Sequence, residues 1–156
     1  MNGSERVTGF MALRFLPAVL VIAVLAWVTV PVAHDAELSP EANYMLHCSG
    51  CHLPDGSGNP PDVPDAREMG RMLAVAGGRE YLVQVPGSSQ AMVSDQAVAD
   101  VVNYMLETFS AEALPADYRP LTAREVGEWR TEWMPDPAAV RQQLMEAAER
   151  TSLTRE

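Results

Sequence analysis

The chain has 156 residues, enough for one domain with appendages, and each of its 11 basic residues is an arginine. From residue 34 onward it carries 9 Arg against 20 Asp or Glu, a net charge of −11. This charge disfavours nucleic acid and anionic lipid surfaces as partners, and the lack of lysine excludes a lysine ring that would steer the protein to acidic partners. A basic patch on a partner would suit the chain better.

The N-terminus contains an apolar segment that predicts export. Arg6 and Arg14 flank the start of an uncharged run over residues 15–33. Its length of 19 residues is intermediate between the short apolar core of a cleaved signal peptide and the length needed to span a bilayer. Cleavage at the end of this run would leave Pro31 three residues before the cut, where a small residue is usual. We expect residues 1–33 to be either a signal peptide or an N-terminal membrane anchor. Both readings place the rest of the chain in the periplasm.

Both cysteines lie in the segment Cys48-Ser49-Gly50-Cys51-His52. Ser39 as N-cap and Pro40 at the first helical position predict a helix that leads into this segment. Two thiols separated by one turn of chain can each form a thioether with one porphyrin vinyl group, and the following imidazole can then ligate the iron. The spacing predicts covalent haem c attached at Cys48 and Cys51, with His52 as the proximal iron ligand.

Three other readings of the two cysteines fit the sequence less well than haem attachment. A zinc site needs further ligands, and neither His34 nor His47 stands at zinc-finger spacing from the motif. A thioredoxin-like redox pair would follow a strand in an α/β pattern, which this sequence does not show. A disulfide between residues three apart would close too small a loop to stabilise much.

The motif is followed by a loop over residues 53–64 that is rich in proline, glycine and aspartate. Glycines in this loop allow the backbone to approach a flat cofactor closely. Residues 66–73 and 79–85 then predict two short helices separated by Gly77-Gly78, and Pro86-Gly87 stops the second.

A longer helix is predicted from the N-cap Ser94 to about residue 109. Its apolar residues recur at helical spacing and form a single face. They are Val98, Val101, Val102, Met105 and Phe109.

The run CHLPDGSG over residues 51–58 resembles the CxxCH motif and DGxG loop of class I c-type cytochromes. The resemblance covers about residues 38–109. It implies a small all-α class I cytochrome c fold around one covalently attached haem, with residues 34–110 as the cytochrome c domain. In that family the C-terminal helix crosses the N-terminal one, and Tyr104 stands where an aromatic packs against the haem-side helix.

The resemblance also implies a hydrogen bond to the second ring nitrogen of the haem histidine. In the family, a proline carbonyl about twelve residues further on accepts this bond, and Pro64 stands twelve residues after His52. Pro60 and Pro61 are close competitors for this role. A proline that only stiffens the loop is the other reading.

The sixth iron ligand of class I cytochromes is a methionine from the loop before the C-terminal helix. Met92 occupies that place, so the resemblance implies Met92 as the distal iron ligand. The family usually has a proline after this methionine, whereas here Val93 follows and Ser94 already caps the helix. Met69 and Met72 are alternatives at positions where methionine often fills a core. A non-methionine ligand or a vacant position also stays open.

Residues 111–156 form a C-terminal helical extension beyond a minimal class I domain. Residues 111–120 are a proline-punctuated linker, and a capping box from Thr122 to Glu125 opens a helix. A second helix is predicted from Asp136-Pro137 to about residue 150. Two tryptophans lie on one stripe of the first helix, at positions 129 and 133. The extension either packs back on the cytochrome domain or serves as a partner-docking arm.

The sequence shows no second haem motif, no flavin or nucleotide fingerprint and no nucleophile elbow. The resemblance therefore implies an electron carrier and not an enzyme. We expect a periplasmic protein that cycles one haem c between Fe(II) and Fe(III) and links a dehydrogenase or quinol-oxidising complex to an oxidase or another cytochrome. Two alternatives stay open: a fixed cytochrome c subunit of a larger redox complex, and a haem-based ligand sensor or peroxidase-like enzyme.

Overall fold

A computed structural model describes residues 38–132 and 134–154. The described residues are helical and contain no strand, apart from an isolated antiparallel bridge between Asn59 and Val63. The expected all-α class is confirmed. The elements are α2 (Pro40–His47), α3 (Ser49–His52), η1 (Ala66–Glu68), α4 (Met69–Met72), α5 (Gly78–Gln84), α6 (Pro86–Ser89), α7 (Asp95–Phe109), η2 (Ala111–Ala113), α8 (Ala123–Trp129) and α9 (Pro137–Leu153).

The chain divides into two units, Met1–Ala36 and Glu37–Glu156. The predicted export segment, residues 1–33, lies outside the described residues. Among the residues that the structure does describe, we found no helix with the length and apolar character needed to cross a membrane.

Helices α2, α7 and α8 begin where the sequence predicts, because the expected caps form. The side chain of Ser39 accepts a hydrogen bond from the Ala42 amide at 3.2 Å, and that of Ser94 accepts one from the Ala97 amide at 3.1 Å. Thr122 opens α8 with the complete capping box. Each such cap satisfies amides that have no partner inside the helix.

Some helix boundaries differ from the sequence expectation. The single helix expected over residues 66–73 is a 3-10 turn followed by α4. Helix α5 ends before Pro86 as expected, and Pro86 also opens the short, unexpected α6, because proline is well suited to a first helical position. The last helix, α9, runs to Leu153, three residues beyond its expected end.

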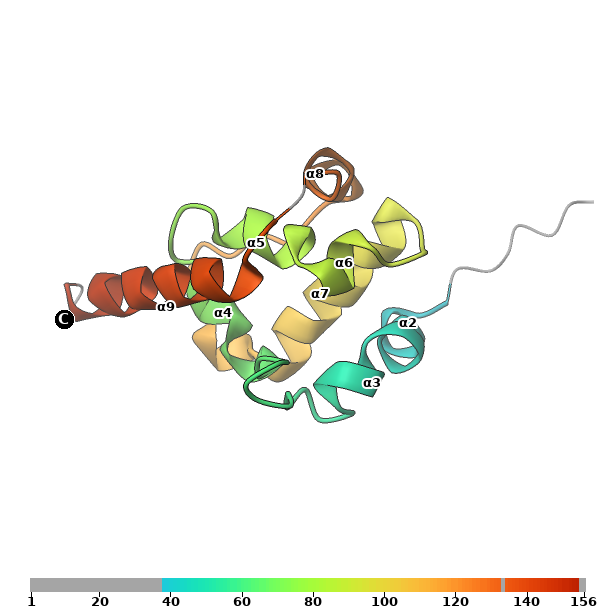
Figure 1. The fold of residues 1–156 in the computed structure, drawn as a ribbon, viewed down its shortest axis with the longest axis horizontal. Helices are drawn as coiled ribbons and strands as arrows, with labels where there is room; N and C mark the ends of the chain where they lie inside the picture. Colours follow the sequence, from blue (N-terminus) through green and yellow to red (C-terminus); the bar gives the residue numbers. More distant parts are fainter. Residues whose placement is uncertain (1–37, 133, 155–156) are drawn as a thin grey trace, which may run out of the picture. The chain divides into compact units, whose positions relative to one another are not determined.

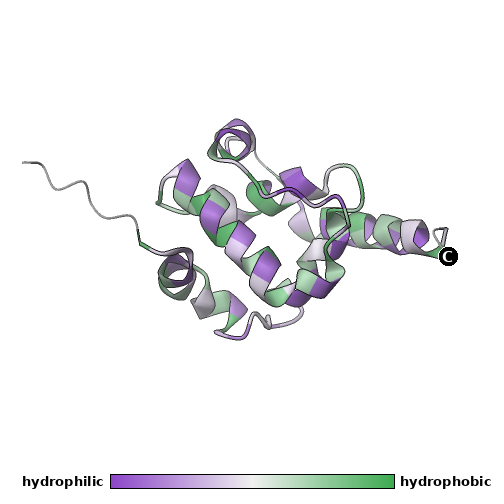
Figure 2. Cartoon of the chain, turned by 180° about the vertical axis from the view of Figure 1, so that it is seen from behind, coloured by the Kyte–Doolittle hydropathy of each residue, from purple (hydrophilic) through white to green (hydrophobic). Residues whose placement is uncertain are grey.

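Helix α7 lies at the centre of the packing, with α2 against one part of it and α8 against another (Figure 1). Figure 2 shows the helices striped in hydrophilic and hydrophobic colours, as expected for elements with one buried face. Most of the predicted apolar face of α7 is buried, and Phe109 is partly buried against the same core. Three aromatic rings pack where α2 crosses α7. The ring centroid of Tyr44 on α2 lies 5.8 Å from that of Tyr104 and 5.1 Å from that of Phe109, both on α7. The expected contact of Tyr104 with the haem-side helix is confirmed.

The C-terminal extension packs on the rest of Glu37–Glu156 and shares its hydrophobic core. Leu121 and Val126 are 4% and 0% exposed, and Trp129 packs against the same cluster. Arg79 of α5 holds the linker, because its guanidinium donates to the Arg119 carbonyl at 2.6 Å and to Glu125 at 2.8 Å. Trp133 lies outside the described residues. The docking-arm reading stays a prediction.

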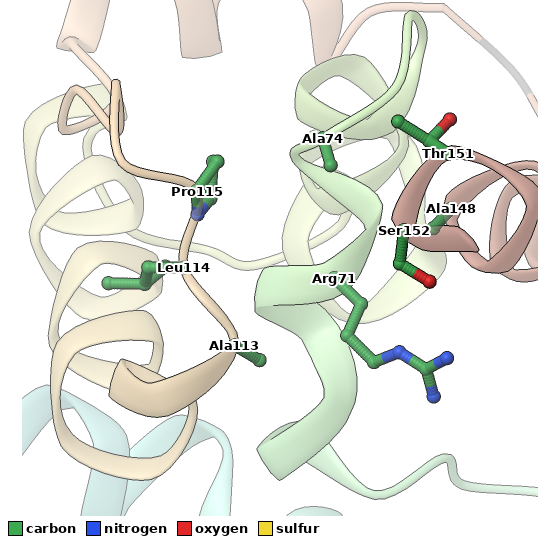
Figure 3. Close-up of a pocket in the computed structure, with 8 residues that line it drawn as sticks. All are labelled: Arg71, Ala74, Ala113, Leu114, Pro115, Ala148, Thr151 and Ser152. Atoms are coloured by element: carbon green, nitrogen blue, oxygen red, sulfur yellow. The ribbon is translucent and has the colours of Figure 1, made fainter. Parts of the chain in front are cut away.

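A cavity of about 190 Å³ lies between the extension and the remaining helices, lined by α4, the η2 segment and α9 (Figure 3). Its lining includes Arg71, whose guanidinium is directed away from Ala113 and Pro115. None of the predicted haem-site residues lines this cavity.

A buried serine joins the start of α4 to the end of α7. The Ser110 hydroxyl accepts from the Gly70 amide at 2.8 Å and donates to the Arg67 carbonyl at 2.8 Å, and the residue is 2% exposed. Ser110→Ala would leave both backbone groups without this partner, so we expect the free energy of unfolding to fall by about 2 kcal/mol. Urea unfolding measures this loss. Ser152→Ala removes an exposed hydroxyl and is the control, and equal midpoints for the two variants would contradict the prediction.

Candidate functional site

The cysteine motif forms one helical turn at the junction of two helices. Cys48 ends α2 and caps α3, and its carbonyl accepts hydrogen bonds from the amides of Cys51 at 3.1 Å and of His52 at 2.9 Å. Residues three and four positions apart on a helix lie on one face. The turn therefore presents both cysteines and the histidine on a common side.

The two thiols are free and differ in environment. Cys48 is half-buried and packs against the core, whereas Cys51 is exposed. Burial, with a smaller contribution from Cys51, raises the pKa of the Cys48 thiol. One thiol thus lies at the inner edge of the turn and the other at its solvent edge.

The imidazole of His52 is half-buried, and burial lowers its pKa, although the backbone of Pro64 and the charge of Asp65 act in the opposite direction. A lowered pKa favours the neutral ring, which is the form that ligates metals. Nδ1 of His52 is buried and makes no hydrogen bond of standard geometry. The hydrogen bond from this ring to Pro64 therefore stays a prediction, although the backbone of Pro64 lies close enough to raise the pKa of His52.

The loop after the motif brings the Pro64 backbone to His52, and it does so by folding tightly on itself. The Val63 amide donates to the Asn59 carbonyl at 3.0 Å. A Cβ added at Gly58 would lie 2.1 Å from the Val63 carbonyl oxygen and 2.5 Å from that of Pro64. A side chain at position 58 would therefore collide with the backbone of the same loop, so this position requires glycine.

Tyr44 supports the end of the motif, a role that sequence reasoning missed. Its side chain is 1% exposed, and its hydroxyl donates to the carbonyl of Leu53 and lies 3.3 Å from that of His52. Burial, with smaller effects from nearby groups, raises the pKa of Tyr44 to about 12, so the hydroxyl keeps its proton for these bonds. Leu53 has φ +56°, a left-handed conformation unusual for leucine, and Tyr44 bonds the carbonyl of this residue.

The methionines considered as distal ligands lie in two different environments. Met92 stands on the segment between α6 and α7, and its side chain is 99% exposed. Met69 and Met72 are 8% and 2% exposed within the core, as expected of methionines that fill a core. The role of Met92 as sixth ligand stays a prediction. His47 is exposed, and His34 lies outside the described residues.

The residues present fit covalent haem. Two free thiols and a half-buried imidazole lie on one turn, and the unpartnered Nδ1 faces the loop that carries Pro64. Across residues 38–132 and 134–154, no three His, Cys, Asp or Glu side chains gather in a way that could hold a metal ion. An all-helical unit with this attachment turn defines a c-type cytochrome.

Comparison with known proteins identifies the family. The chain is 31% identical over 108 residues to a cytochrome c-552 of Thermus thermophilus, a match that covers 57% of this chain and 82% of the relative. It is also 31% identical over 108 residues to a second cytochrome c-552 from a strain of the same organism, covering 73% of that protein. No family model matches the chain. The chain belongs to the class I c-type cytochromes.

Membership in this family carries several consequences. The protein is a haem c electron-transfer protein, an electron carrier rather than an enzyme, and its haem is covalently bound. Its partners are redox proteins.

Proposed function

We propose that this protein is an exported monohaem carrier in which Cys48 and Cys51 hold the haem while His52 and Met92 ligate the iron. One observation carries the proposal: two free thiols and a buried, unpartnered imidazole nitrogen share a single helical turn. Haem c, when bound there, supplies one-electron chemistry at its iron.

The surrounding residues have separate tasks in this proposal. The Pro64 carbonyl orients the His52 ring and raises its basicity, as groups behind a ligating histidine do. Val98 and Val101 of α7 are 1% and 7% exposed and exclude water from the interior. A thioether from Met92 would raise the reduction potential and close the iron to outside ligands.

We further propose that the carrier works in the periplasm, free or tethered by residues 15–33. Its donor is a dehydrogenase or a quinol-oxidising complex, and its acceptor is an oxidase or another cytochrome. The acidic, lysine-free composition supports a partner with a basic docking patch, and salt would slow such an encounter. The packed C-terminal extension would equally suit a fixed subunit of a larger redox complex. Co-purification with a large partner in mild detergent would favour the fixed subunit.

Met92→Ala tests the ligand assignment and the carrier function together. In the unchanged protein we expect low-spin optical bands that carbon monoxide does not move, and a weak near-infrared charge-transfer band in the oxidised state. Because the variant lacks the thioether, it should lose the near-infrared band completely, have a lower reduction potential and bind carbon monoxide when reduced. Optical spectra with and without the gas measure the ligand effects, and a redox titration measures the potential.

Met45→Ala is the matched control, because Met45 is also an exposed methionine, on α2. It should keep the spectrum of the unchanged protein. If carbon monoxide already binds the unchanged protein, the sixth position is open, and the ligand-sensor alternative replaces the closed carrier. The 99% exposure of Met92 is the observation that favours this alternative.

A further inference from the structure

Arg130, the residue that ends α8 in the C-terminal extension, contacts the segment that carries Met92. Its Nη1 lies 2.8 Å from Oδ1 of Asp95 and 3.1 Å from the Val93 carbonyl oxygen. Its Nη2 donates to the carbonyl of Ala91 and, at 3.5 Å, to that of Ser89. The side chain is only 16% exposed, so these bonds are partly shielded from water.

These contacts lie on both sides of Met92. Ala91 and Val93 are its chain neighbours, and Asp95 is the first residue of α7. Residues 90–93 follow α6 and precede α7, so the carbonyls of Ala91 and Val93 lie outside any helix. One planar guanidinium supplies donors to both, a geometry that lysine cannot reproduce.

A glycine in α8 allows this approach. Gly127 has no Cβ, and an added one would lie 2.7 Å from Oδ2 of Asp95. The same carboxylate receives Arg130 on its other oxygen. Asp95 therefore contacts both Gly127 and Arg130, and these contacts join the start of α7 to the extension.

Met92 itself has no comparable support. Its side chain is 99% exposed, so packing of neighbouring side chains does not determine its position. The backbone determines it, and the carbonyls on both sides of Met92 accept hydrogen bonds from Arg130. An ordered backbone reduces the conformational freedom that a loop loses when its side chain binds a ligand.

We propose that Arg130 is a positioning residue for the axial-ligand segment, through which the C-terminal extension sets how firmly Met92 holds the iron. This inference rests on the proposed role of Met92. Without Arg130, the segment samples more conformations, the thioether occupies the iron for a smaller fraction of time, and an outside ligand competes better.

The test compares two arginine variants of the haem-loaded full chain. Arg130→Gln removes the contacts to residues 89–95. Arg141→Gln is the matched control, since Arg141 is 22% exposed and joins the extension to Glu68 at 2.9 Å, away from this segment. For Arg130→Gln we expect a weaker near-infrared band and imidazole binding about tenfold tighter than in the unchanged protein. Hydrogen exchange at the amides of residues 90–93 should also be about tenfold faster.

Arg141→Gln should leave the near-infrared band, the imidazole affinity and the exchange at residues 90–93 unchanged. Arg130→Lys keeps the charge without the planar guanidinium, so its near-infrared band, imidazole affinity and exchange rate should lie between those of the unchanged protein and of Arg130→Gln. It replaces Arg130→Gln as the test variant if the glutamine variant does not fold.

Two results would overturn the inference: Arg130 variants with the band, affinity and exchange of the unchanged protein, or equal changes in both arginine variants. Met92→Ala separates this failure from failure of the proposed function. If Met92→Ala leaves the spectrum unchanged, the ligand assignment itself is wrong and the inference is wrong with it. If Met92→Ala alters the spectrum and Arg130→Gln does not, only the inference is wrong.

Discussion

Replacing both Cys48 and Cys51 with alanine is expected to abolish covalent haem attachment completely. In the proposed site each thiol forms one thioether, and without them His52 would hold a haem only by a bond to iron that denaturation breaks. Mass spectrometry of the denatured protein should show the mass of one haem on the unchanged chain and none on the variant. The same spectrum shows whether residues 1–33 remain on the mature protein.

Met92→Ala is the control for this experiment, because it alters the proposed distal ligand and leaves both thiols in place. It should retain the full haem mass. A double cysteine variant that still carries haem after denaturation would contradict attachment at this turn. A mass increase of two haems on the unchanged chain would contradict the proposal of a single haem.

Gly58→Ala is expected to destabilise the protein, because it disturbs the loop that lies behind His52. The new Cβ would lie 2.1 Å from the Val63 carbonyl oxygen and 2.5 Å from that of Pro64, and backbone atoms cannot yield as a flexible side chain can. We expect the free energy of unfolding to fall by about 2 kcal/mol. The Pro64 carbonyl should also move relative to His52, which NMR shifts of the ring protons would report.

Gly87→Ala is the matched control, since a Cβ at Gly87 would meet nothing within 4 Å. Gly87 lies in α6, so alanine should be neutral or stabilise by about 0.5 kcal/mol through the unfolded chain. Urea midpoints of the two variants give the comparison. A Gly58→Ala protein as stable as the Gly87→Ala protein would show that the loop relaxes without cost.

Local features of this protein could be read from the sequence because neighbouring residues determine them. The caps at Ser39, Ser94 and Thr122 bond amides three residues away, so the residue types suffice to predict them. The haem motif is equally local, since both cysteines and the histidine lie within five residues. Pro86 follows the end of α5 as predicted, but α6 was not predicted, because proline can both end one helix and open the next and the sequence pattern alone does not show which.

Contacts between distant residues could not be predicted in this way. The Tyr44 hydroxyl reaches the Leu53 carbonyl only because α2 and the turn after the motif fold together, and tyrosine in an amphipathic helix otherwise signals only burial. Arg130 gave no sequence signal, because an arginine near the end of a helix is common on protein surfaces. Its partners lie 35 to 41 positions earlier in the chain.

The sequence alone determined the cofactor chemistry, the helical class and the starts of the capped helices, since these depend on residue type and short spacing. Only the tertiary structure decided that the extension shares the core of the cytochrome unit, that Gly58 lies against the Pro64 carbonyl, and that Arg130 holds the segment around Met92. The physical reason is that burial and partner choice arise when segments far apart in the chain come together, and no local pattern encodes which segments will meet.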